Sequence, residues 1–149
     1  MAKTILIFGL PGSGKTTLAT ELCKLIDADW YNADVIRKQA DDWDFSDEGR
    51  LRQCNRMRSL CAESNKSERH AVADFVCPRN EYRAIFKPDM TIWMNTIAEG
   101  RFEDTNQIFE DPIGLRIHKG DFMIDKGSWW TEDCTKIWAK LIASKVNKW

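Results

Sequence analysis

The sequence predicts a three-layer α/β fold, with a mostly parallel sheet and helices on both faces. Short apolar runs typical of buried strands alternate with segments of helical periodicity. No repeat, low-complexity tract or Pro/Ser-rich linker divides the chain, and its 149 residues fit one domain. We therefore expect a single domain over residues 1–149.

The first half of the chain predicts two strands and two helices. Thr4–Phe8 is a continuous apolar run that suits a central strand buried on both faces. A helix is expected at Lys15–Ile26, where leucines and an isoleucine recur at helical spacing. A short strand is expected at Asp29–Asn32, and a polar helix with one apolar side at Glu48–Ser64.

Two strands and a short helix are expected next. His70–Val76 is a strand that ends before Pro78, because proline cannot donate to a sheet ladder. Asn80 is expected to cap a helix that runs to Phe86, and Met90–Met94 is the following strand.

The last third is less regular. Residues 97–113 are expected to form a flap without regular structure, followed by a short strand at Leu115–Ile117. Residues 120–130 have no assigned structure, and Trp129 and Trp130 there fit either a cover for a nucleotide base or an anchor for the terminal helix. That helix begins at Thr131, and its expected apolar face consists of Ile137, Trp138, Leu141 and Ile142.

Charge and cysteine content exclude several classes of protein. With 22 Lys and Arg against 23 Asp and Glu, the net charge of -1 argues against extended nucleic-acid binding. No apolar run approaches the roughly 18 residues of a membrane span. The 5 cysteines include no C-x-x-C pair, so we expect neither a disulfide framework nor a zinc site. We expect a cytoplasmic location, where thiols stay reduced. These features leave open whether the protein forms a homodimer.

A phosphate-binding loop is the strongest motif. Residues 9–16 read Gly-Leu-Pro-Gly-Ser-Gly-Lys-Thr and match G-x-x-x-x-G-K-[ST], between a predicted strand and a predicted helix. Glycines let backbone N–H groups converge on phosphates, Lys15 adds a charge, and the Thr16 hydroxyl suits Mg²⁺. We expect a P-loop NTPase fold that binds ATP and Mg²⁺ through Gly9, Pro11, Gly12, Ser13, Gly14, Lys15, Thr16 and Thr17.

The motif does not by itself distinguish a kinase from a hydrolase. A glycine-rich turn that binds nothing is the structural alternative, but Lys15 and Thr16 argue against it. The N-K-x-D guanine signature is absent, and the chain is short for a helicase or transporter ATPase. A kinase for a small acceptor is the favoured interpretation.

Asp34 and Arg37 are the first acceptor-side candidates. Asp34 follows a predicted strand, where a carboxylate can orient or deprotonate an acceptor hydroxyl. Arg37, one helical turn later, can hold an anionic group. The alternative is a helix-capping aspartate with a surface arginine.

Phe45, Arg50 and Gln53 form the second candidate group. Ser46 and Asp47 suit a helix cap, and Arg50 and Gln53 recur at three-residue spacing. An aromatic ring beside arginines suits a nucleotide-like acceptor. The alternative is a solvated basic helix with Phe45 in the core.

Asp74, within an apolar strand, is the third candidate. Its position suggests a Walker B acid that acts on Mg²⁺ together with Thr16. The alternative is an aspartate at the wet end of the strand that binds local backbone.

Together these segments resemble the adenylylsulfate (APS) kinase family. The matching stretches are the phosphate loop, residues 32–37 (Asn-Ala-Asp-Val-Ile-Arg), Phe45-Ser46 with Arg50, and residues 75–78 (Phe-Val-Cys-Pro), spread over residues 3–95. The resemblance implies ATP-dependent phosphorylation of the 3′-hydroxyl of APS to give PAPS. It implies that Asp34 addresses the hydroxyl, Arg37 and Arg50 hold the phosphosulfate, Phe45 stacks on adenine, and Gln53, Phe75, Val76 and Cys77 complete the pocket.

The chain departs from the family pattern at three places. Gln53 lies where the family has an asparagine, and Cys77 lies where it has a serine. Residues 99–109 replace the family's lid motif, Arg-Asp-Pro-Lys-Gly-Leu-Tyr. Arg101 in this segment is either a catalytic flap cation or a surface arginine. The alternatives for the protein as a whole are a kinase for a nucleoside, polynucleotide end or metabolite, and a non-catalytic ATP-binding module.

Overall fold

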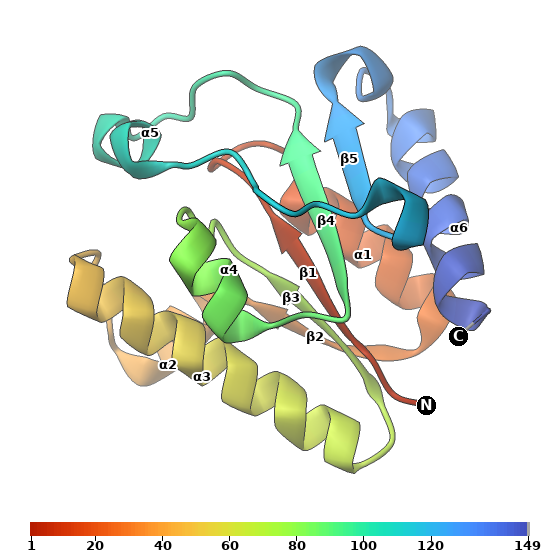
Figure 1. The fold of residues 1–149 in the computed structure, drawn as a ribbon, viewed down its shortest axis with the longest axis horizontal. Coiled ribbons are helices and arrows are strands. Elements are labelled where there is room, and N and C mark those ends of the chain that lie inside the picture. The colour runs from red at the N-terminus through yellow and green to blue at the C-terminus, as the bar shows by residue number, and fades with distance from the viewer. Residues whose placement is uncertain (149) are drawn as a thin grey trace.

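Five parallel strands form the central sheet in the order β2-β3-β1-β4-β5 (Figure 1). The computed structural model describes residues 1–148. All four strand pairings are parallel, which confirms the expected fold class. The strands are β1 (Thr4–Phe8), β2 (Ala28–Asn32), β3 (His70–Asp74), β4 (Met90–Asn95) and β5 (Phe122–Asp125).

Helices cover both faces of this sheet, as predicted (Figure 1). The helices α1 (Lys15–Ile26) and α6 (Glu132–Asn147) lie on one face; α2 (Ala33–Ala40), α3 (Asp47–Lys66) and α4 (Asn80–Phe86) lie on the other. A further helix, α5 (Glu103–Ile108), lies beyond the carboxyl ends of the strands. None of the helices within residues 1–148 combines the length and apolar composition that crossing a lipid bilayer requires.

β1 lies at the centre and contributes to two separate cores. Ile5 and Ile7 pack toward α1 and α6, whereas Leu6 and Phe8 pack toward α3 and α4, and all four side chains are fully buried. A strand covered on both faces needs apolar residues at every position, which is why the run has no polar alternation. β1 pairs Ile7 with Asp74 of β3, so Asp74 ends next to the phosphate loop.

The last strand lies further along the chain than predicted. Leu115–Ile117 is not a strand, since Ile117 is 54% exposed and begins a 3-10 helix, Ile117–Lys119. β5 falls instead within the stretch that had no assignment. Asp121 fixes its start, because its carboxylate accepts hydrogen bonds from the backbone N–H groups of Thr91 and Arg116.

The buried face of α6 also differs from the prediction. Ile137 and Leu141 are 57% and 52% exposed, whereas Ile142 is fully buried. The face in contact with the core uses small side chains, Ala139 and Ala143, which let α6 approach α1 closely. The predicted apolar face was therefore wrong for Ile137 and Leu141 and right for Trp138 and Ile142.

Two local predictions near the flap were also wrong. Residues 97–113 include a regular helix, α5, rather than only irregular chain. Asn80 does not cap α4, whose N-cap is Arg79 without a side-chain hydrogen bond. The Asn80 amide instead donates to the Asp111 carbonyl, and its oxygen accepts from the Ile113 N–H, so α4 is joined to the end of the flap.

The position of α6 predicts opposite outcomes for two isoleucines. We expect Ile142→Ala to lower the free energy of unfolding by about 2–4 kcal/mol, because it leaves a cavity in the core. Ile137→Ala, on the exposed face, should cost less than about 1 kcal/mol. Chemical denaturation of both variants measures the difference, and equal losses would contradict the described packing.

Candidate active site

The phosphate loop is an open cradle of backbone. Gly12 and Gly14 adopt positive φ of 87° and 101°, which glycine tolerates best. A Cβ on Gly12 would meet nothing nearer than the Ile97 side chain at 4.0 Å, so this side of the loop has room for a ligand. A Cβ on Gly14 would lie 2.7 Å from the Trp129 indole nitrogen, so Trp129 packs directly on the loop.

Lys15 brings a buried charge into this cradle. Its side chain is 9% exposed, and its ammonium donates to the Leu10 carbonyl at 2.9 Å. Burial lowers the pKa of Lys15 to about 8, although the nearby carboxylates of Asp74 and Asp34 oppose the shift. Within residues 1–148 the ammonium forms no ion pair, so its charge is available to an anion in the cradle.

Thr16 and Asp74, the two residues of the Walker B interpretation, contact each other beside the loop. The Thr16 hydroxyl donates to the Asp74 carboxylate at 3.0 Å, and Asp74 is 2% exposed. Burial raises the pKa of Asp74, while the Asn32 amide, Lys15 and Thr16 oppose this shift. Asp74 is therefore not a solvent-facing group that binds only local backbone.

The predicted acceptor residues converge on this loop. A cavity of about 300 Å³ is lined by Lys15, Asp34, Phe45, Arg50 and Arg101, together with Pro11, Gly12, Thr16, Asp74, Phe75 and Val76. A second cavity of about 60 Å³ adjoins it through shared walls and adds Arg37, Gln53 and Cys77. Within the loop Gly9 and Ser13 are buried and Gly14 is half-buried under Trp129, while Thr17 is exposed in the first turn of α1.

Asp34 lines both cavities from the first turn of α2. It is not the helix cap: Asn32 is, because its side-chain oxygen accepts from the Val35 N–H at 3.2 Å. The Asp34 side chain is exposed and forms no hydrogen bond within residues 1–148. Its carboxylate is therefore available to a ligand.

Phe45 lies between the acceptor arginines and solvent. It is 48% exposed, so it is not a core residue. The guanidinium carbons of Arg37 and Arg50 lie 4.3 and 5.4 Å from the centre of its ring. Burial lowers the pKa of both arginines, and neither forms an ion pair with a carboxylate among residues 1–148. They keep two positive charges at one end of the cavity.

Gln53 and Cys77 line the smaller cavity but have structural partners. The Gln53 amide donates to the Ala33 carbonyl at 3.1 Å and its oxygen accepts from Arg56, so it joins α3 to α2. Cys77 is 2% exposed, adopts a positive φ of 43°, and burial raises the pKa of its thiol. Both residues shape the cavity wall rather than offer free polar groups.

Among the residues that line the main cavity, four with polar or aromatic side chains were missed from the sequence. Phe102, Asp104 and Thr105 reach the main cavity from the flap, and Asn32 contacts both Thr16 and Asp74. The Thr105 hydroxyl accepts from Arg50 at 3.4 Å. Nothing in the flap sequence indicates this contact. Asn32 could have been predicted, because it is a polar residue at the carboxyl end of a predicted strand, where ligands bind in parallel sheets.

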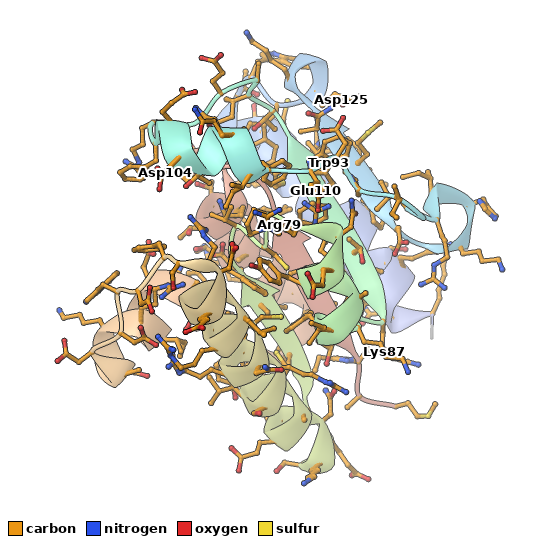
Figure 2. All side chains as sticks on the ribbon, turned by 60° about the vertical axis from the view of Figure 1, so that its left-hand side comes forward. Arg79, Lys87, Trp93, Asp104, Glu110 and Asp125 are labelled. Atoms are coloured by element: carbon orange, nitrogen blue, oxygen red, sulfur yellow. The ribbon has the colours of Figure 1, made fainter. Side chains whose placement is uncertain are left out.

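Arg83 ties the end of the flap to the body of the protein. It is 8% exposed and donates to the carbonyls of Cys77, Pro78 and Glu110. Glu110 lies beside the start of α4, where Arg79 is labelled (Figure 2), and its carboxylate accepts from the Asn80 N–H at 2.9 Å. One end of the flap is thus fixed, while Phe102 remains 52% exposed.

Comparisons with known proteins show the family and the fold of this chain. The model of a family described as "AAA domain" matches residues 5–88. A probable adenylyl-sulfate kinase of Aeropyrum pernix is 30% identical over 120 residues, which cover 72% of this chain and 63% of the relative.

Two solved structures share the fold at low sequence identity. A sugar kinase from Janibacter superimposes with a TM-score of 0.75 at 14% identity, covering 99% of this chain and 98% of that one. The Mycobacterium tuberculosis APS kinase, solved with AMPPNP and APS, has a TM-score of 0.72 at 17% identity, with 98% of each chain covered. At such identities the likeness establishes the fold and leaves the acceptor open.

The buried ammonium predicts proton uptake when a nucleotide binds. At pH 8.5 most of the free protein should have neutral Lys15, because its pKa is about 8. Phosphates raise the pKa of a neighbouring ammonium, so binding takes up a fraction of a proton at pH 8.5, where the phosphates of ADP are already ionised. Calorimetry of ADP binding in buffers of different ionisation enthalpy measures this uptake. An enthalpy independent of the buffer at pH 8.5 would contradict it.

Proposed function

The chain belongs to the AAA-domain family of P-loop proteins, and we propose that it is an ATP-dependent kinase for a hydroxyl group of a small acceptor. APS is the acceptor that the residues support best. The observation that carries this proposal is the convergence of Lys15, Asp34, Phe45 and Arg50 on one cavity. In this proposal residues 1–149 are one kinase domain and residues 97–113 are its lid.

The phosphate loop offers the donor nucleotide a fitting site. The open space before Gly12 and the buried ammonium of Lys15 suit a polyphosphate. The hydroxyl of Thr16 and the carboxylate of Asp74 are the oxygen ligands that Mg²⁺ prefers, directly or through water. Bound Mg²⁺ would neutralise charge on the transferred phosphoryl group.

The opposite end of the cavity fits an anionic, aromatic acceptor. Arg37 and Arg50 provide positive charge, and neither forms an ion pair with a carboxylate of residues 1–148, although nearby aspartates act on both at longer range. Phe45 from the α2–α3 loop and Phe102 from the flap both line the cavity with exposed rings, which suits a planar base. APS has both a nucleobase and an anionic group.

Asp34 and Arg101 would act on the reacting groups. From the first turn of α2, the Asp34 carboxylate accepts a hydrogen bond from the acceptor hydroxyl and aims its oxygen at the phosphorus. Arg101, on the flap side of the same cavity, would stabilise charge on the transferred group and close over it. Positioning and electrostatics are sufficient, because phosphoryl transfer needs no covalent enzyme intermediate.

A second acceptor class is favoured by one specific observation. Asp104 lines the same cavity and its charge acts on Arg50, which reduces the attraction for an anionic acceptor. A neutral polyol, such as a sugar or nucleoside, would hydrogen-bond to this carboxylate instead. Polyol acceptors therefore belong beside APS in the test.

A direct assay tests the proposal. Purified protein with Mg-ATP should release ADP only when an acceptor is added, and with APS it should form PAPS. Acceptor-dependent turnover with a sugar or nucleoside but not with APS would transfer the assignment to the second class. Nucleotide binding without turnover on any acceptor would identify a non-catalytic ATP-binding module and refute the kinase proposal.

Asp34→Asn tests the role of the acceptor carboxylate. Turnover should fall by about 10²-fold or more, since an amide cannot take up the hydroxyl proton. ADP affinity should change by less than about twofold, because Asp34 is not part of the phosphate loop. Asp41→Asn, at the exposed end of the same helix, is the matched control. Equal effects of the two substitutions would contradict a catalytic role.

Asp104→Asn distinguishes the two acceptor classes. For an anionic acceptor the KM should fall several-fold, because the substitution removes a repelling charge near Arg50. For a polyol held by Asp104 the KM should rise. Glu103→Gln, also exposed on α5 but outside the cavity, controls for general charge effects. Unchanged KM in both variants would show that Asp104 does not face the acceptor.

A further inference from the structure

Asn32 lies where the ends of β2 and β3 meet. The parallel register pairs Asn32 with Asp74, and both residues end their strands. The Asn32 amide nitrogen lies 2.9 Å from the Asp74 Oδ2 and 3.2 Å from the Thr16 hydroxyl. Since Thr16 itself donates to Asp74 Oδ2 at 3.0 Å, the three side chains form a closed triangle.

Capping alone does not account for asparagine at this position. The cap of α2 uses only the side-chain oxygen, which Ser, Thr or Asp would supply equally well. The triangle uses the amide nitrogen, and asparagine is the short side chain that both accepts for a cap and donates from an NH₂ group. A carboxylate here would face Asp74 as a like charge and favour a shared proton.

We propose that Asn32 is a positioning residue for the metal site, which holds the Thr16 hydroxyl and the Asp74 carboxylate in place for Mg²⁺. Asn32 and Asp74 act as one unit that carries a single negative charge. The inference rests on the proposed binding of a magnesium nucleotide. Residues that orient metal ligands typically change metal affinity by about 10–100-fold when they are replaced.

Asn32→Ser separates the two roles of the side chain. Serine keeps a cap oxygen but loses the amide donor. We expect the ratio of ADP affinities with and without Mg²⁺, measured by calorimetry, to fall by about 10-fold. The cap remains, so the melting temperature should fall by only a few degrees, which is the cost of one lost donor to the buried Asp74 carboxylate. An unchanged affinity ratio would reduce Asn32 to a helix cap and overturn the proposal.

An exchanged pair tests whether the two side chains act as a unit. Asp74→Asn alone removes the negative charge, whereas Asn32→Asp combined with Asp74→Asn restores one charge and one amide in reversed order. The exchanged pair should recover part of the Mg²⁺ dependence that Asp74→Asn loses. No recovery would overturn the single-unit proposal. A wild-type protein that binds ADP no more tightly with Mg²⁺ would instead refute the proposed function itself.

Discussion

The buried ammonium of Lys15 is the constraint around which this molecule is organised. A charge that is only 9% exposed must have partners, and within residues 1–148 the ammonium hydrogen-bonds to the Leu10 carbonyl. The carboxylates of Asp74, at the end of β3, and Asp34, in the first turn of α2, act on it, and Arg101 acts on it with the opposite sign from the flap. The site is therefore electrostatically prepared for an anion, because a polyphosphate compensates charges that the protein leaves incompletely balanced.

The parallel sheet supplies the rigid floor of this arrangement. β1, β2 and β3 end side by side, so the phosphate loop, Asn32 and Asp74 are fixed by the strand register. The opposite wall is attached differently. Arg83 and Asn80 fix the end of the flap to α4 through backbone carbonyls, while Arg101 and Phe102 stay exposed nearer its start. The floor of the cavity is thus fixed by the strand register, and the end of its flap wall is fixed by α4.

The acceptor end depends on a braced loop between α2 and α3. Arg52 and Arg56 both bind the Asp42 carboxylate and hold its pKa well below the usual range. Gly49 passes so close to the backbone of Asp44 that a Cβ has no room there. These contacts fix the loop that carries Phe45, and Arg37 reinforces it by donating to the carbonyls of Asp42 and Asp44. The exposed ring is thus presented by an ordered segment.

The sequence by itself determined β1, the phosphate loop and α1, because their signals are contiguous and depend on local backbone conformation and on continuous burial. It also placed Asp34, Arg37, Phe45, Arg50 and Asp74 near one sheet edge, since the carboxyl ends of parallel strands lie together. Only the tertiary structure decided the position of β5, which depends on its pairing with β4. It also decided the buried face of α6, where close packing against α1 favours the small side chains of Ala139 and Ala143. It alone brought Phe102, Asp104 and Thr105 to the cavity and closed the triangle of Asn32, Thr16 and Asp74, since these contacts join residues far apart in the chain.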